Sequence, residues 1–267
     1  MIESNTVRRI KGARIGGNWM LSWIAPAVLF VLWFAATNLR WVDPFVLPTP
    51  QAMGAALWDF LLNGYDRASF LGHLSASLFR TTAGIVLGLA LAIPVGLVLG
   101  YSKTLYLVIS PIFNFLRPIP AIAYLPLIIL YMGIGETTKV FVIALAVFLY
   151  TVLNTSNGVR SVPTQLIGAA ENLGLNRRQL FIHVILPGTM PFIIVGVKMA
   201  TAVGWALVVA AELVAAQQGL GYVIMNAATF FNIPLVYIGI ALIGIMGIVL
   251  ELLVRILERR YLHWQGK

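Results

Sequence analysis

The stretch from Val162 to Gly174 reads VPTQLIGAAENLG and begins the longest polar interruption in an otherwise apolar chain. Pro163 suits the first turn of a helix, and Gly174 suits the residue just past a helix end. Between them, small or apolar residues recur at three- and four-residue spacing: Leu166, Ala169, Ala170 and Leu173. This spacing puts them on one side of a short helix. With Arg177 and Arg178 close behind, that face suits docking into a groove on another protein.

The composition indicates a membrane protein that crosses the bilayer several times. Of the 267 residues, 60% are hydrophobic and only 10% are charged, whereas a soluble domain carries about 25% charged residues. The chain has no cysteine, which excludes disulfides, thiolate chemistry and cysteine-based metal sites. A formal net charge of +9 could suggest nucleic acid. The basic residues cluster instead in segments expected to face the cytoplasm, so we expect no nucleic-acid partner.

Hydropathy predicts an all-α protein with six transmembrane helices and both termini in the cytoplasm. The expected spans are residues 19–37, 81–100, 105–131, 140–153, 192–216 and 235–254. They form one transmembrane domain, residues 19–260, between a basic tail at 1–18 and a short tail at 261–267. The basic start of the chain precedes a retained first span and not a cleaved signal peptide, because no small-x-small cleavage site ends the run. A cytoplasmic loop, residues 157–189, lies within the domain.

Charge counting supports this orientation. Twelve of the 18 lysines and arginines fall in segments expected inside, and two fall within spans. The outer segments hold four: Arg40, Arg67, Arg80 and Lys139. This three-to-one bias follows the positive-inside rule.

Glycine and proline add detail to the spans. The pairs Gly84–Gly88 and Gly96–Gly100 have the four-residue spacing that lets helices approach closely in lipid. Another stripe of small residues in the fifth span also predicts a helix contact: Gly196, Ala200 and Gly204. The third span contains four prolines, which predict kinks: Pro111, Pro118, Pro120 and Pro126.

The sequence shows no catalytic or nucleotide-binding motif. A Gly-x-x-x-x-Gly-Lys-Ser/Thr loop is absent, so ATP would have to be hydrolysed by another subunit. The histidines His73, His183 and His263 lack metal-ligand spacing, and His183 is expected to be a polar interface residue. An intramembrane enzyme is disfavoured because no nucleophile–base pair or metal cluster stands out.

Three ionisable residues lie well within the spans, where a charge is costly: Arg117, Lys198 and Glu212. Two interpretations remain open. Arg117 and Lys198 could offer positive potential to a small anion on its path, or the charged residues could form a structural ion pair between spans, such as Arg117 with Glu212. Glu251 is expected to pair with Arg255, one helical turn away. An ion-coupled secondary transporter would need several intramembrane carboxylates, and Glu212 is the one candidate well inside a span.

The segment Ala169–Gly174, followed by residues 184–187 (VILP), resembles the cytoplasmic signature loop of permease subunits of binding-protein-dependent ABC importers. Gly168 stands where the family has a leading glutamate, and Val184 where it usually has isoleucine. The missing carboxylate leaves open which polar contacts hold the ATPase. Further stretches resemble the taurine and aliphatic-sulfonate branch, which is similar to the nitrate, bicarbonate and pyrimidine-precursor permeases: residues 45–50, 117–127, 133–139, 204–205, 210–213 and 219–221.

The resemblance implies a type I ABC importer permease fold in the bacterial inner membrane. Two copies would form the pore for a small anion such as taurine, and a periplasmic binding protein would deliver it. An ATPase dimer, not this chain, would bind ATP and Mg²⁺, so no cofactor is expected here and the lipid bilayer is the remaining partner. The resemblance implies coupling to the ATPase through Leu166, Ala169, Ala170, Glu171, Leu173, Gly174 and Arg177, and a substrate pathway that includes Arg117, Lys198 and Glu212.

Overall fold

The computed structural model describes residues 19–261. The predicted basic tail at residues 1–18, the end of the chain from residue 262 and His263 lie outside the described residues. The chain divides into two compact units, Met1–Gly54 and Ala55–Lys267. Among residues 19–261 there is no β-strand, only an isolated bridge between Tyr65 and Ala68. The predicted all-α class is therefore confirmed.

The first unit contains helix α1 (Trp19–Asn38) and the start of α2 (Pro50–Asn63). The bounds of α1 agree closely with the first expected span. Trp33 Nε1 donates a hydrogen bond to the carbonyl of Pro48 at 3.1 Å, which fastens the connecting loop to the helix. The Thr49 hydroxyl accepts the N–H of Ala52 at 3.2 Å and so caps α2.

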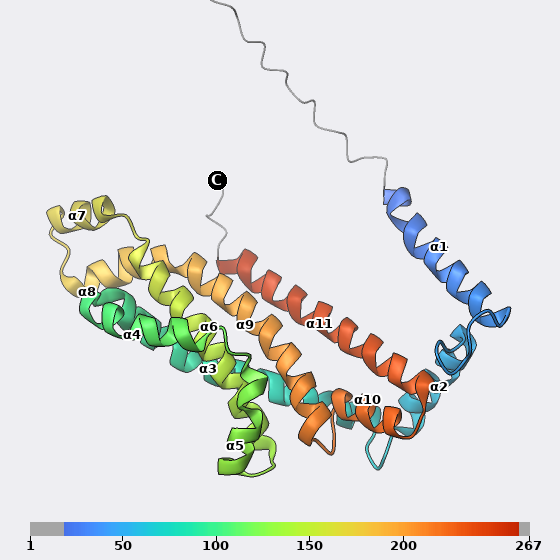
Figure 1. The fold of residues 1–267 in the computed structure, drawn as a ribbon. Coiled ribbons are helices and arrows are strands. Elements are labelled where there is room, and N and C mark those ends of the chain that lie inside the picture. Colours follow the sequence, from blue (N-terminus) through green and yellow to red (C-terminus); the bar gives the residue numbers. More distant parts are fainter. Residues whose placement is uncertain (1–18, 262–267) are drawn as a thin grey trace, which may run out of the picture. The chain divides into compact units, whose positions relative to one another are not determined.

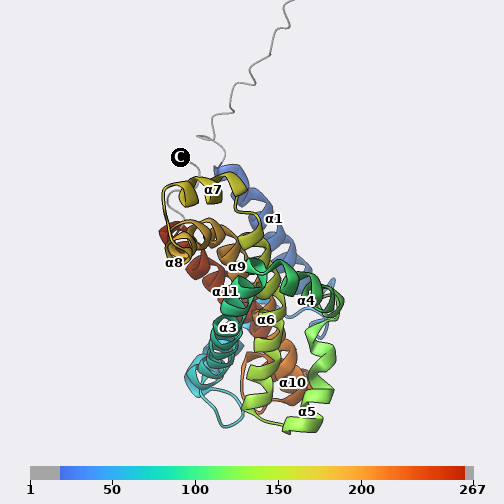
Figure 2. The same cartoon turned by 90° about the vertical axis from the view of Figure 1, so that its left-hand side faces the viewer.

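The second unit holds the remaining helices (Figure 1). In chain order they are α3 (Phe70–Tyr101), α4 (Lys103–Leu116), η1 (Ala121–Tyr124), α5 (Leu125–Met132), α6 (Glu136–Arg160), α7 (Thr164–Asn172), α8 (Arg177–Leu180), η2 (Phe181–Ile185), α9 (Leu186–Ala215), α10 (Leu220–Thr229) and α11 (Ile233–Tyr261). In both views α7 lies at one end of this bundle and α5 and α10 lie at the other (Figures 1 and 2). We refer to these as the α7 end and the α10 end.

Helix α6 is the centre of the bundle and packs against α3 through a row of small residues. On α3 this row consists of Gly84, Gly88, Ala92, Gly96 and Gly100. A Cβ atom placed on Gly84 would lie 2.5 Å from Ile143 Cγ2, and one on Gly88 would lie 2.6 Å from Val147 Cβ. Any larger residue there would push the helices apart, so the backbones meet closely. The packing predicted from the two Gly-x-x-x-Gly motifs is confirmed.

The stripe predicted on α9 also lies at a helix contact. A Cβ atom on Gly196 would lie 3.4 Å from Thr151 Cγ2 of α6, and Ala200 is fully buried. At Gly204 the nearest atoms belong to Ile85 of α3 and Ile143 of α6. The small residues of α9 therefore let it pack against both neighbours.

The third expected span is sharply bent. The chain bends by 85° between α4 and the η1–α5 segment. Pro118 and Pro120 stand at the break, Pro111 lies within α4 and Pro126 lies in the first turn of α5. Since proline removes a helical hydrogen bond, this break confirms the predicted kinks.

Among residues 19–261, four helices are long and apolar enough to cross a membrane: α3, α6, the continuous α8–α9 segment and α11. The bent pair makes a fifth if it counts as one span. The remaining expected span, the first, coincides with α1, whose described apolar part, Trp23–Asn38, is shorter. A multi-pass membrane protein is therefore shown, with four to five clear spans.

Two helices, α3 and α6, begin earlier than the sequence predicts, and each then includes a charged residue that was expected outside it. Helix α3 begins at Phe70, not at residue 81, because the Ser69 side chain accepts the N–H of Gly72 and caps the helix. Arg80 therefore lies inside α3 and not in an outer segment. Likewise α6 begins at Glu136, so Lys139 lies in its first turn, buried, and not on an exposed connecting turn.

Replacement of Gly88 by alanine should destabilise the bundle. The added Cβ would lie 2.7 Å from the carbonyl oxygen of Ala144, a backbone atom that moves only if α6 moves. We expect a loss of about 1–3 kcal/mol, the usual cost of overpacking, measured by equilibrium unfolding in mixed detergent. Gly244→Ala on α11 is the matched control, because no atom lies within 4 Å of its added Cβ. Equal stability of the two variants would contradict the close α3–α6 contact.

Candidate functional site

Helix α7 ends in a Schellman motif that the sequence encodes. Gly174 has a positive φ of 81°, which glycine adopts at no steric cost. Its N–H bonds the Glu171 carbonyl at 2.9 Å, and the N–H of Leu175 bonds the Ala170 carbonyl at 3.2 Å. These are the two bonds of the motif. The prediction that Gly174 follows a helix end is confirmed, whereas Pro163 precedes the first helical residue and does not lie within the first turn.

The loop continues into α8 through a second local motif. Asn176 accepts the N–H of Gln179 at 2.9 Å, and the Gln179 side chain accepts the N–H of Asn176 at 3.0 Å. This reciprocal capping box satisfies two free donors at the helix start. His183 follows in η2, where its ring bonds the Gln179 carbonyl at 3.0 Å. The fold of this loop is therefore set mainly by nearby residues.

The predicted coupling residues divide between two sides of α7. Ala170 faces inward and packs against Val159 of α6, Leu180 of α8 and Ile185 of η2. The other six are exposed: Leu166, Ala169, Glu171, Leu173, Gly174 and Arg177. The Leu173 side chain is 81% exposed. A Cβ at Gly168 would meet no atom within 4 Å, so a side chain at this position has open space.

A buried ion-pair network lies at the α10 end. Glu212 of α9 is 1% exposed and accepts hydrogen bonds from Ser77 at 2.8 Å and Arg80 at 2.6 Å. It also accepts the N–H of Gly221 at 2.9 Å. Arg80 Nη1 donates a further bond to the Gln218 carbonyl at 2.6 Å. One carboxylate thus joins α3, α9 and the start of α10.

The network extends to α6 through Glu136. Arg80 Nε lies 2.5 Å from Glu136 Oε2, and Lys139 Nζ lies 2.8 Å from Glu136 Oε1. Two cations and two carboxylates therefore balance one another. Such balance is what keeps charges tolerable in a poorly solvated interior.

His73 fixes the start of α3 against the α9–α10 connection. Its Nδ1 accepts the N–H of Gly219 at 3.2 Å. The other ring nitrogen, Nε2, therefore carries the hydrogen and donates to the Tyr65 carbonyl at 2.9 Å. Nearby, outside the candidate spans, Tyr222 donates a hydrogen bond to Asp66, and this bond raises the pKa of Tyr222 to about 12. Both contacts hold α10 against the loop before α3.

The three charged residues expected along a pathway are not brought together. Arg117 ends α4 and stacks its guanidinium 5.3 Å from the Tyr150 ring centroid. Lys198 pairs with Glu258 at 2.8 Å and lines a cavity of about 460 Å³ between α9 and α11. Glu212 does form a structural ion pair between spans, as one of the two interpretations expected, but its partner is Arg80 and not Arg117. The expected Glu251–Arg255 pair is confirmed at 2.8 Å.

The sequence prediction missed Arg80 and its network partners Glu136 and Lys139. Polar residues recur along one face of α3 at three- and four-residue spacing: His73, Ser77, Arg80 and Thr81. That row continues directly into the glycine row that contacts α6. Together with the capping residue Ser69, this pattern could have placed Arg80 on the buried face.

No group of three or more His, Asp or Glu side chains within residues 19–261 could hold a metal ion. The arrangement offers instead an exposed loop helix at one end, an ion-pair network with a polar cavity at the other, and an apolar bundle between them.

Comparison with known proteins identifies the chain's family. Residues 84–263 match the binding-protein-dependent transport system inner membrane component family. The chain belongs to this family. Its members are transport components of the membrane, in agreement with the resemblance found from the signature loop.

Relatives of this transport family match over most of their length. The taurine transport system permease protein TauC of Escherichia coli is 39% identical over 90% of this chain and 88% of its own. A Bacillus subtilis protein, SsuC, named as an aliphatic sulfonates transport permease, is 34% identical over 99% of this chain and 94% of its own. The riboflavin transport system permease protein RibX of Chloroflexus aurantiacus is also 34% identical, over 90% of this chain and 88% of its own.

Solved structures support the fold of this family. A chain of the MetNI methionine ABC transporter aligns with a TM-score of 0.62 and covers 71% of this chain and 94% of its own, at 21% identity. A chain of an amino acid ABC transporter aligns with a TM-score of 0.58 over 70% of this chain and 92% of its own. The permease fold expected from the sequence is confirmed.

Replacement of Glu212 by glutamine should cost about 3 kcal/mol of unfolding free energy, because it leaves the buried Arg80 charge incompletely balanced. The measurement is equilibrium unfolding in mixed detergent. Glu251→Gln is the matched control, since Glu251 and its partner Arg255 are more than half exposed and such pairs contribute about 0–1 kcal/mol. If both variants unfolded alike, the network would not stabilise the fold.

Proposed function

We propose that this chain is the permease subunit of an ATP-driven importer that carries a small organic anion, with taurine or another aliphatic sulfonate as the preferred cargo. Two copies would form the pore. A periplasmic binding protein would deliver the solute at the α10 end, and an ATPase dimer would dock at the α7 end. In this orientation the α7 end is cytoplasmic, as the excess of basic residues in the expected inner segments favours.

The exposed face of α7 carries the proposal. Leu166 and Leu173 are 55% and 81% exposed, although they flank the buried Ala170. Apolar side chains displayed on a short capped helix suit insertion into an apolar groove of a partner. The sequence has no nucleotide-binding loop of its own, so a partner ATPase is the occupant we propose. Arg177, exposed just beyond α7, can contact acidic groups at the rim of that groove.

Movement of α7 would be transmitted because its inner side is packed. Ala170 contacts Val159 near the end of α6 and Ile185 at the end of η2, which leads into α9. When the ATPase subunits close on ATP, the two α7 helices of a dimer would approach each other and carry α6 and α9 with them. ATP thereby favours one of two pore states, and hydrolysis restores the other.

Two relatives support an anionic sulfonate as the cargo, TauC and SsuC. Arg117 and Lys198 remain our candidates for positive potential along the path. Glu212 is turned into the bundle, so we propose that it holds Arg80 in place and does not contact the solute. Nitrate, bicarbonate or a pyrimidine precursor is the alternative cargo for the same machine. RibX, at 34% identity, is named for riboflavin, so identity at this level does not by itself assign the cargo.

Replacement of Leu173 by aspartate should uncouple the ATPase from transport. The charge would enter the apolar groove unpaired, so we expect substrate-stimulated ATPase activity to fall at least about tenfold, equivalent to about 1.4 kcal/mol. Leu173→Met is the matched control, because it keeps an apolar side chain at this exposed position. Stimulated activity at the wild-type level in Leu173→Asp, with unchanged assembly, would remove the coupling role of α7.

The cargo is tested by co-purifying the permease with its ATPase and binding protein and assaying ATPase activity over a panel of small anions. We expect stimulation by taurine or ethanesulfonate in the presence of the binding protein. If only nitrate or bicarbonate stimulates the ATPase, the chain is still part of an importer, but its substrate is that anion and not a sulfonate. If no ATPase co-purifies with the permease, the proposal of an ATP-driven importer is wrong.

A further inference from the structure

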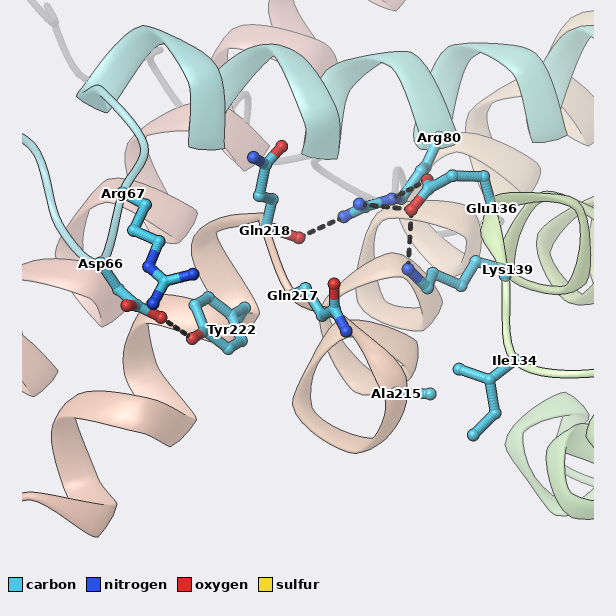
Figure 3. A pocket seen from close by; sticks show the side chains of 11 residues that line it. Asp66, Arg67, Arg80, Ile134, Glu136, Lys139, Ala215, Gln217, Gln218 and Tyr222 are labelled. Carbon is cyan, nitrogen blue, oxygen red and sulfur yellow. Dashed lines mark hydrogen bonds and ion pairs between the residues drawn. The ribbon is translucent and has the colours of Figure 1, made fainter.

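A polar cavity opens at the α10 end of the second unit (Figure 3). Its volume is about 760 Å³, and five charged residues line it: Asp66, Arg67, Arg80, Glu136 and Lys139. Gln217, Gln218 and Tyr222 add further polar lining. Convergent polar groups in a cavity of this size suit a small charged solute.

The carboxylate of Glu136 binds the two cations, Arg80 and Lys139, in the wall of this cavity. Its Oε2 accepts from Arg80 Nε at 2.5 Å, and its Oε1 accepts from Arg80 Nη2 at 2.8 Å. Lys139 Nζ donates to the same Oε1 at 2.8 Å. One edge of the Arg80 guanidinium thus forms a two-pronged contact, the geometry in which arginine binds oxyanions in general. We call these two cations the Arg80–Lys139 site, and Glu136 is its internal anion.

The two cations are buried, whereas the carboxylate is open to the cavity. The side chains of Arg80 and Lys139 are 3% and 5% exposed, but that of Glu136 is 55% exposed. Arg80 is also held from behind by Glu212 and by the Gln218 carbonyl, each at 2.6 Å. The guanidinium would therefore keep its place without Glu136. Because Glu212 balances only one of the two cations, the site would then attract another anion.

Glu136 can leave the site by rotation about its own side-chain bonds. It follows the turn Gly133–Gly135, where a Cβ on either glycine would meet no atom within 4 Å. The Thr138 hydroxyl donates to the Gly133 carbonyl at 2.6 Å and holds the backbone of this turn. Because the Glu136 side chain is 55% exposed and lines the cavity, its carboxylate can rotate into that cavity while the start of α6 stays in place.

We propose that the Arg80–Lys139 site binds the sulfonate or carboxylate head of a small organic anion, and that this head displaces Glu136. The inference rests on the proposed function for the class of solute. The three oxygens of a sulfonate can contact the Arg80 fork and the Lys139 ammonium together. The site would hold the solute at the entrance to the bundle.

Competition by Glu136 lowers the affinity of this site. The apparent dissociation constant equals the intrinsic one divided by the fraction of molecules in which Glu136 has left. A solute therefore binds weakly and is released readily, as conduction through a pore requires. Removal of the Glu136 charge should increase affinity, which is the opposite of what loss of an ordinary binding residue does.

The test is calorimetric titration of the full-length permease in lipid nanodiscs, without the binding protein, with taurine and ethanesulfonate. We expect Glu136→Gln to bind both anions about tenfold more tightly than wild type, a gain of about 1.4 kcal/mol. Lys139→Gln should bind them at least about tenfold more weakly. Glu251→Gln on α11 is the matched control and should bind as wild type does. Ethyl methyl sulfone, which has no charge, should not bind.

The proposal is overturned if Glu136→Gln binds no more tightly than wild type, or if Lys139→Gln binds equally well, with thermal unfolding confirming that each variant is folded. The binding protein and the ATPase take no part in this titration. If the affinities for sulfonates follow the expected order among the variants but sulfonates do not stimulate the ATPase, the proposed cargo is wrong and the Arg80–Lys139 site still stands. If sulfonates stimulate the ATPase but Glu136→Gln does not change the affinity for them, the proposed site is wrong and the proposed function still stands.

Discussion

The close contact between α3 and α6 is the constraint on which the second unit depends. In lipid, apolar surface gains little by leaving one apolar neighbour for another, so helices associate through close packing and polar contacts. At four glycines of α3, an added Cβ would lie closer to a side chain of α6 than ordinary van der Waals contact allows: Gly84, Gly88, Gly96 and Gly100. With α6 held against α3, its other side is free to receive α9. The order of the bundle follows from this arrangement.

The same close approach makes the ion-pair network possible. Arg80 lies on the face of α3 that continues the glycine row, and it therefore points into the bundle where α6 and α9 converge. A buried arginine needs compensation from more than one side. Glu212 supplies it from α9 and Glu136 from α6. Packing and electrostatics are thus not independent, because a wider helix spacing would separate the charges that balance each other.

Local signals in the sequence were sufficient for part of this structure. The glycine rows, the proline break and the helix stop at Gly174 depend on residues within a few positions of one another, and all were predicted. The partner of Glu212 was not, because Arg80 lies 132 positions away and the pairing depends on how α3 and α9 face each other. The start of α3 was missed for a related reason. Its first turns carry His73, Ser77 and Arg80, which look unlike a membrane span until their buried partners are known.

The helical segment from Arg177 to Ala215, in which the π-helix η2 joins α8 to α9, has a mechanical consequence. Its 39 residues correspond to a rod of about 58 Å at the usual rise per residue. One end begins within the loop that contains α7, and the other carries Glu212. A tilt of about 5° about one end displaces the other by about 5 Å at this length. A small rotation at one membrane face is thereby amplified at the opposite face, so that the α8–α9 segment has the geometry of a lever arm.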